Sequence, residues 1–149
     1  MTKVAFYHLQ TRSLLDAIPS LAAKIFASSM RGLIKAKDKD TLNAIDKALW
    51  TFTADSFLPH RISGKGFEQD QGLLLSLDDE NLNDANVLML VDGAKIPDIS
   101  GFERVLYIFD GNTPERVTQA REDWKVLKET EANLSYLQQN DQGGWDQKI

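Results

Sequence analysis

The sequence predicts an α/β fold: a single three-layer domain over residues 1–149, with helices flanking a mostly parallel, five-stranded, Rossmann-like sheet. Segments with a strand pattern alternate with segments with a helix pattern from the start of the chain. Three short apolar runs are continuous, which is typical of parallel strands covered on both faces. A length of 149 residues suits one domain and is short for two.

Residues 4–9 predict the first strand, and a helix follows it. Ser13 can cap this helix, and the apolar residues that come next recur at helical spacing. Pro19 falls inside the pattern, so the helix either kinks there or begins near it, and both alternatives stay open.

Residues 31–36 predict a second strand, and Asp40 or Thr41 can begin a second helix. One face of this helix is apolar, formed by Leu42, Ile45, Leu49 and Phe52. Residues 61–70 contain two glycines and no hydrophobic period, so they predict the longest loop.

The apolar runs at residues 73–77, 87–91 and 105–109 complete the five predicted strands. Thr113 and Pro114 then predict a sharp helix start, in which the Thr113 side chain accepts from free amides and the helix runs to about Glu131. The remaining residues either continue as a helix or fold back as an extended tail, and the pattern does not decide between the two.

Composition limits the possible partners. With 17 Lys plus Arg against 22 Asp plus Glu, the net charge of −5 argues against direct binding of nucleic acid through its phosphates. The chain has no cysteine, which excludes disulfides and Cys-ligated metals and suits a reducing cytoplasm. No signal peptide or membrane-spanning run is expected, so we predict a cytoplasmic protein with no membrane partner.

Few residues suggest catalysis or a cofactor. The turn after the first predicted strand has no glycine, so no nucleotide cofactor is expected there. Asp92 and Asp110 each end a predicted strand before a glycine, and together they could hold a magnesium ion in a small α/β enzyme. Asp-Gly pairs are also ordinary turns, the interpretation we favour. For His8 and His60 we expect structural hydrogen bonds, so no catalytic residue is predicted.

The last predicted helix carries a cationic face. Val117, Arg121, Trp124, Lys125 and Lys128 recur at spacings of three and four residues. An arginine fork beside an indole is suited to an acidic, aromatic peptide. The alternative is a solvated charged face with Trp124 turned into the core.

A second candidate surface follows the second predicted helix, at residues 49–60. Trp50, Phe52 and Phe57 run out of the helical pattern into a segment that ends at Pro59 and His60. Such aromatics either cap the core or offer a docking surface to a partner.

Several segments, in their order and spacing, resemble the chi subunit family of bacterial DNA polymerase III. The resemblance covers the chain from end to end. It is carried by residues 6–9 (FYHL), 49–52 (LWTF), 56–60 (SFLPH), 91–93 (VDG), 120–125 (AREDWK) and 143–145 (GGW).

The resemblance implies an accessory subunit of the DNA polymerase III holoenzyme in DNA replication, without catalytic activity of its own. Such subunits link the clamp loader to single-stranded DNA-binding protein by holding its acidic, phenylalanine-terminated tail. The arginine and aromatic of the family's tail site match Arg121 and Trp124, and we expect Lys125, Lys128 and Trp145 to complete that site.

The family's second interface, toward the psi subunit, implies a second set of contacts. Its phenylalanine matches Phe57. We expect Trp50, Leu58, Pro59 and His60 to contact psi or another clamp-loader component.

Overall fold

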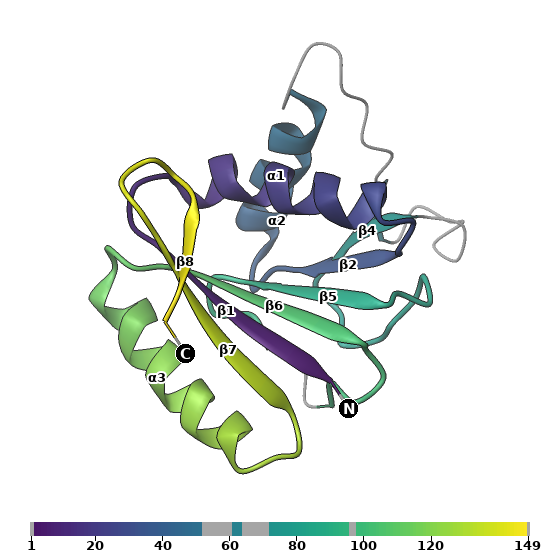
Figure 1. Cartoon of the computed structure of the whole chain (residues 1–149). Coiled ribbons are helices and arrows are strands. Elements are labelled where there is room, and N and C mark those ends of the chain that lie inside the picture. The colour runs from purple at the N-terminus through teal and green to yellow at the C-terminus, as the bar shows by residue number, and fades with distance from the viewer. Residues whose placement is uncertain (1, 52–60, 64–71, 96–97, 149) are drawn as a thin grey trace.

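The computed structural model describes residues 2–51, 61–63, 72–95 and 98–148 (Figure 1). Several residues of the predicted psi-binding set lie outside these ranges. They are Phe57, Leu58, Pro59 and His60, together with Phe52 of the second predicted helix.

One sheet runs through the molecule, with eight strands in the described part of the chain. Its order is β3-β4-β2-β5-β6-β1-β7-β8, and every neighbouring pair is parallel except β7 with β8. The strands are β1 Lys3–Leu9, β2 Gly32–Lys35, β3 Arg61–Ile62, β4 Leu73–Ser76, β5 Val87–Val91, β6 Arg104–Asp110, β7 Asn133–Gln139 and β8 Trp145–Gln147.

The five predicted strands form the contiguous centre of this sheet, in the order β4-β2-β5-β6-β1. The predicted fold class is therefore confirmed. The strand count was too low, because β3 is added at one edge and β7 with β8 at the other.

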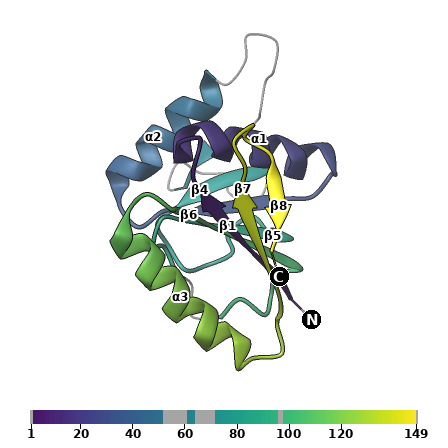
Figure 2. The same ribbon diagram turned by 60° about the vertical axis from the view of Figure 1, so that its left-hand side comes forward.

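Helices cover both faces of the sheet (Figure 2). α1 (Leu14–Ala27) and α2 (Lys39–Trp50) lie on one face, and α3 (Pro114–Lys128) lies on the other. The described residues include no helix whose length and apolar character would let it cross a membrane.

Local sequence explains where α1 and α2 begin. The Ser13 hydroxyl oxygen accepts from the Asp16 amide at 3.3 Å, as a helix cap does. Pro19 is buried inside α1, so the alternative that the helix begins near Pro19 is wrong. α2 begins earlier than predicted, because Asp38 caps it by accepting from the Thr41 amide at 2.8 Å.

Both ends of α3 differ in detail from the prediction. Pro114 is its first residue, as expected. The Thr113 side chain does not cap the free amides, because its hydroxyl donates to Asp110 Oδ2 at 2.8 Å. The helix ends at Lys128, three residues before Glu131, and the chain turns there to enter β7.

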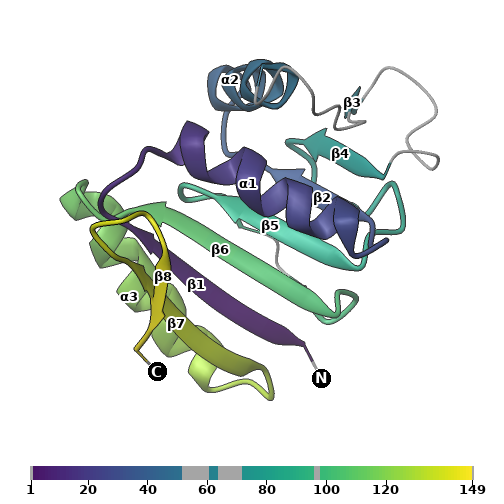
Figure 3. The ribbon, with the colours of Figure 1, turned by 45° about the horizontal axis from the view of Figure 1, so that its top comes forward.

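The chain after α3 is extended and folds back on the sheet. β7 pairs in parallel with β1, and β8 returns along β7 as a hairpin (Figure 3). Of the two alternatives left open for this region, the extended tail is therefore correct. The predicted loop at residues 61–70 begins with β3, which pairs with β4.

The two faces of the sheet pack two separate cores. Strand alternation sends Phe6 to the α3 side and Tyr7 to the α1 and α2 side. Trp124 packs in the first core, and Trp145 packs in the second. This division decides which predicted site residues can meet.

Candidate functional site

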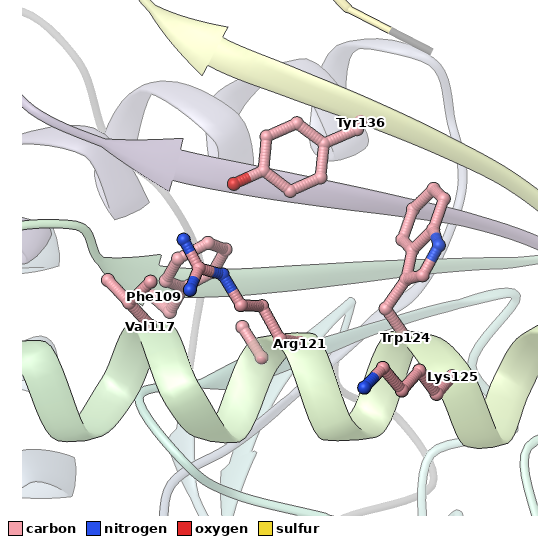
Figure 4. A pocket seen from close by; sticks show the side chains of 7 residues that line it. Phe109, Val117, Arg121, Trp124, Lys125 and Tyr136 are labelled. Atoms are coloured by element: carbon pink, nitrogen blue, oxygen red, sulfur yellow. The ribbon is translucent and has the colours of Figure 1, made fainter.

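A pocket of about 310 Å³ lies between α3 and the adjacent strands. Helix α3 contributes one wall, and the strands β6 and β7 contribute the aromatic side chains that face it (Figure 4). The lining is mostly apolar with two cations at its rim, and it consists of Phe109, Val117, Ala120, Arg121, Trp124, Lys125 and Tyr136.

The guanidinium of Arg121 is open to a ligand. The Arg121 side chain is exposed, and within the described part of the chain no carboxylate lies within 4 Å of it as an ion-pair partner. Lys125, one turn further on, lies at the same rim. Two cations therefore border the apolar surface without being neutralised by the described acids.

One acidic residue of α3 faces away from this pocket. Asp123 Oδ1 lies 3.0 Å from Lys95 Nζ, and Asp123 Oδ2 accepts from the Tyr107 hydroxyl. Burial, followed by this contact with Asp123, raises the pKa of Tyr107 well above its usual range. Asp123 is thus engaged on the other side of the helix and does not neutralise Arg121.

Trp124 is half-buried and forms part of the pocket wall. Its ring stands edge-on to Phe6 at 5.1 Å between centroids and to Tyr136 at 5.9 Å. The alternative in which Trp124 turns toward the core is therefore borne out for this side chain, and the binding interpretation stays a prediction. The indole packs on the core, and it also lines the pocket.

Tyr136 forms the opposite wall and is held by a residue of β1. Its hydroxyl is hydrogen-bonded to His8 Nδ1 at 2.5 Å, which confirms the structural hydrogen bond expected for His8. Burial raises the pKa of Tyr136, and the nearby charge of Arg121 opposes that rise. The hydroxyl of Tyr136 therefore stays protonated at neutral pH, and its ring is fixed across from α3.

Two predicted members of the peptide-binding set do not line the pocket. Lys128 is exposed at the last residue of α3, one turn beyond Lys125. Trp145 lies on the opposite face of the sheet, edge-on to Tyr7 at 4.9 Å between ring centroids. The structure does not bring Trp145 together with Arg121, because β8 folds over the α1 side of the sheet.

Sequence reasoning missed three lining residues: Phe109, Ala120 and Tyr136. Ala120 shares the helical face of Arg121 and Trp124, so spacing on α3 could have found it. Phe109 and Tyr136 come from strands, and only the pairing of β6 and β7 with β1 places them here.

The two carboxylates of the magnesium alternative do end neighbouring strands, since β5 pairs with β6. Each has a partner of its own. Arg116 Nε lies 3.2 Å from Asp92 Oδ1, and Asp110 accepts from the Asn112 amide and the Thr113 hydroxyl. Within the described residues, no three side chains of the His, Cys, Asp or Glu type meet as metal ligands would.

The turn after β5 also follows ordinary Asp-Gly chemistry. Asp92 and Gly93 both have positive φ, at 47° and 94°, and the Ala94 amide donates to the Val91 carbonyl at 3.1 Å. This is the pattern of a type I′ turn. The favoured interpretation of this Asp-Gly pair as a turn is confirmed.

Of the second predicted surface, the described residues include Trp50. It ends α2 and is 54% exposed, so it does not cap the core. Its predicted partners in this surface lie outside the described residues.

The α3 pocket has the chemistry of a receptor for an anionic chain with an apolar side chain. A guanidinium offers a planar fork for a carboxylate, and the aromatic walls offer apolar area to a flat group. Lys125 at the rim and Lys128 one turn beyond it extend the positive charge along α3.

Comparison with known proteins points to one family. The family model described as "DNA polymerase III chi subunit, HolC" matches residues 1–135 of this chain. The DNA polymerase III subunit chi of Haemophilus influenzae is 29% identical over 140 residues, covering 91% of this chain and 96% of the relative.

Two further relatives carry the same subunit name. A protein of Rickettsia prowazekii named "Probable DNA polymerase III subunit chi" is 27% identical over 117 residues, covering 74% of this chain and 71% of the relative. The DNA polymerase III subunit chi of Escherichia coli is 32% identical over 73 residues, which cover 44% of this chain and 50% of the relative.

Proposed function

The chain belongs to the DNA polymerase III chi subunit family, and on this premise we propose that it binds the acidic, phenylalanine-terminated tail of single-stranded DNA-binding protein through the α3 pocket. Membership in the family gives it an accessory role in DNA replication. The proposal adds the tail as ligand, the clamp loader as the second partner, and the absence of catalytic activity in the chain itself.

The observation that carries the proposal is the exposed Arg121 guanidinium beside an apolar pocket. A guanidinium without an acidic partner can form charge-assisted hydrogen bonds to a carboxylate of the tail. The adjacent apolar lining, which includes Trp124 and Tyr136, can pack against an aromatic side chain, since aromatic pairs prefer edge-on or offset arrangements.

The remaining cations fit the acidic residues of such a tail. Lys125 lies at the rim, and Lys128 lies one turn further along α3. Exposed charges of this kind add little affinity each, but they attract an acidic peptide and set its direction along the helix.

The second partner is assigned to a surface that includes Trp50. Trp50 ends α2, which packs on the sheet face opposite α3. An aromatic side chain so exposed is suited to a protein interface. We assign it, with Phe57, Leu58, Pro59 and His60, to the psi subunit or another clamp-loader component, in a cytoplasmic complex that this chain joins without touching DNA or membrane.

The magnesium enzyme considered from the sequence is not proposed. Asp92 is paired with Arg116, and Asp110 accepts two hydrogen bonds within its own turn. Both carboxylates thus have contacts within the protein that explain their positions without a metal.

A calorimetric titration with tail peptide tests the proposal. Arg121→Ala should weaken binding by tenfold or more, because a charge-assisted contact contributes on the order of 1.5 to 3 kcal/mol. The matched control is Arg104→Ala, which removes the same charge from an exposed residue of β6. By the strand register, Arg104 belongs to the sheet face opposite the pocket. If both variants bind the peptide with the affinity of the wild-type protein, Arg121 is not part of the site.

A further inference from the structure

His8 lies directly behind the pocket without lining it. Its ring stands 4.9 Å from the Phe109 ring, and its Nδ1 is hydrogen-bonded to the Tyr136 hydroxyl. Both of these partners line the pocket. Gly111 closes the other side so tightly that a Cβ placed there would clash with the imidazole. The imidazole is therefore fixed in one place, next to the ligand position.

Among the described residues, three charged or titratable groups face the imidazole from the elements that pack against it. Arg121 reaches it from α3, Asp110 from the end of β6, and Tyr136 from β7. Burial, and then the positive charge of Arg121, lower the pKa of His8, while Asp110 acts in the opposite direction. His8 in the free protein is therefore mainly neutral at pH 7.

The contact with Tyr136 is compatible with both protonation states of His8. A neutral imidazole accepts from the hydroxyl at Nδ1, and an imidazolium donates to it there, because a phenol oxygen serves both roles. Protonation therefore adds a charge beside the pocket without requiring the Tyr136 wall to move.

We propose that His8 couples ligand capture to proton uptake, so that the α3 pocket binds an anionic peptide end more tightly as the solution becomes mildly acidic. This inference rests on the proposed function, since it concerns the same pocket. It gives His8 a role in ligand binding in addition to its structural hydrogen bond with Tyr136.

The direction of the effect follows from linkage. Arg121 repels a proton on His8 in the free protein, and a bound carboxylate would offset that repulsion and add an attraction of its own. The pKa of His8 should then be higher in the complex than in the free protein. A proton taken up on binding means, by reciprocity, that lowering the pH strengthens binding.

The pH dependence of binding can be measured between about pH 8 and about pH 5.5. Aspartate and the α-carboxyl group have ordinary pKa values of about 4 or lower, so the peptide keeps its charge over this range. A rise of about half to one unit in the pKa of His8 corresponds to at most about three- to tenfold tighter binding, a limit that is reached only below the pKa of the free protein.

The test is an NMR titration of the imidazole signals of the full chain, with and without an N-acetylated peptide of aspartates that ends in phenylalanine. The chain has two histidines, so a His60→Asn variant identifies the His8 signal. We expect the His8 titration midpoint to rise by about half to one unit when the peptide is bound, and calorimetry to show tighter binding at pH 5.5 than at pH 8, by at most about three- to tenfold.

Three results overturn the inference, and they are distinguishable. If the peptide binds without changing the titration midpoint of His8, and its affinity is the same at both pH values, the coupling is wrong and the proposed function stands. If the peptide binds at neither pH, both proposals fail. His8→Asn keeps a hydrogen-bonding atom near the position of Nδ1 and should flatten the pH profile. A pH slope that survives this substitution would also contradict the coupling.

Discussion

At the scale of single residues, Gln139 holds the loop that connects β1 to α1. Its side-chain oxygen accepts from the backbone amides of Gln10, Thr11 and Arg12, at 3.1, 2.9 and 2.8 Å. In nucleotide-binding α/β proteins the amides of this loop cradle a phosphate. Here a buried side chain satisfies them, which is consistent with a loop that contains no glycine.

Removing that oxygen should destabilise the fold. We expect Gln139→Leu to lower the free energy of unfolding by about 1 to 3 kcal/mol, because three amides lose their acceptor. Gln139→Glu keeps an acceptor in place and should cost less. Urea unfolding of both variants measures this difference in the free energy of unfolding. If Gln139→Leu is as stable as the wild-type chain, water replaces the Gln139 oxygen as the acceptor for the three amides.

Single residues of α3 show what spacing can and cannot predict. The positions of Arg121 and Lys125 on one helical face followed from the sequence. Which acid neutralises which base did not, since Asp123 pairs with Lys95 from a distant loop. The availability of Arg121 is therefore a result of tertiary structure.

At the scale of elements, the central strands were predictable because they are buried on both faces and read as continuous apolar runs. β7 was not, since its sequence NLSYLQQ is polar and most of its residues are only partly buried. β3 has two residues, too few for any pattern. The elements that were missed are those at or near the edges of the sheet.

In the hairpin formed by β7 and β8, Trp145 supports the fold and lies away from the pocket. Trp145 packs on Tyr7 on the face opposite the pocket. We expect Trp145→Ala to reduce stability by about 1 to 3 kcal/mol through lost apolar area. The tail peptide should bind the folded variant with unchanged affinity, measured by calorimetry well below the unfolding temperature.

A substantial loss of affinity in that variant would give Trp145 a role in the site after all. Trp124→Ala serves as the comparison, because it removes an indole from the pocket itself. The pair of variants therefore tells a structural indole from a binding one.

At the scale of the whole molecule, the α3 pocket and Trp50 lie on opposite sides of the sheet. α3 carries the pocket, and α2 ends at Trp50 on the other face. The proposed adaptor role needs two surfaces that can be occupied at once, and the separation of the pocket from Trp50 is compatible with that role. The sequence alone does not predict this arrangement, because it depends on how β1, β6 and β7 pair in the sheet.

The three tryptophans of the chain report on three separate regions. Trp124 lies in the pocket, Trp145 on the opposite sheet face, and Trp50 at the end of α2. Each indole N–H gives its own signal in a proton–nitrogen NMR spectrum, and single substitutions assign the three signals.

Adding the tail peptide to the labelled full chain and following these signals tests the central claim most directly. We predict that the Trp124 signal shifts in a saturable way while the Trp50 and Trp145 signals stay in place. A stationary Trp124 signal, with a shift at Trp50 or Trp145 instead, would place the tail elsewhere and contradict the account.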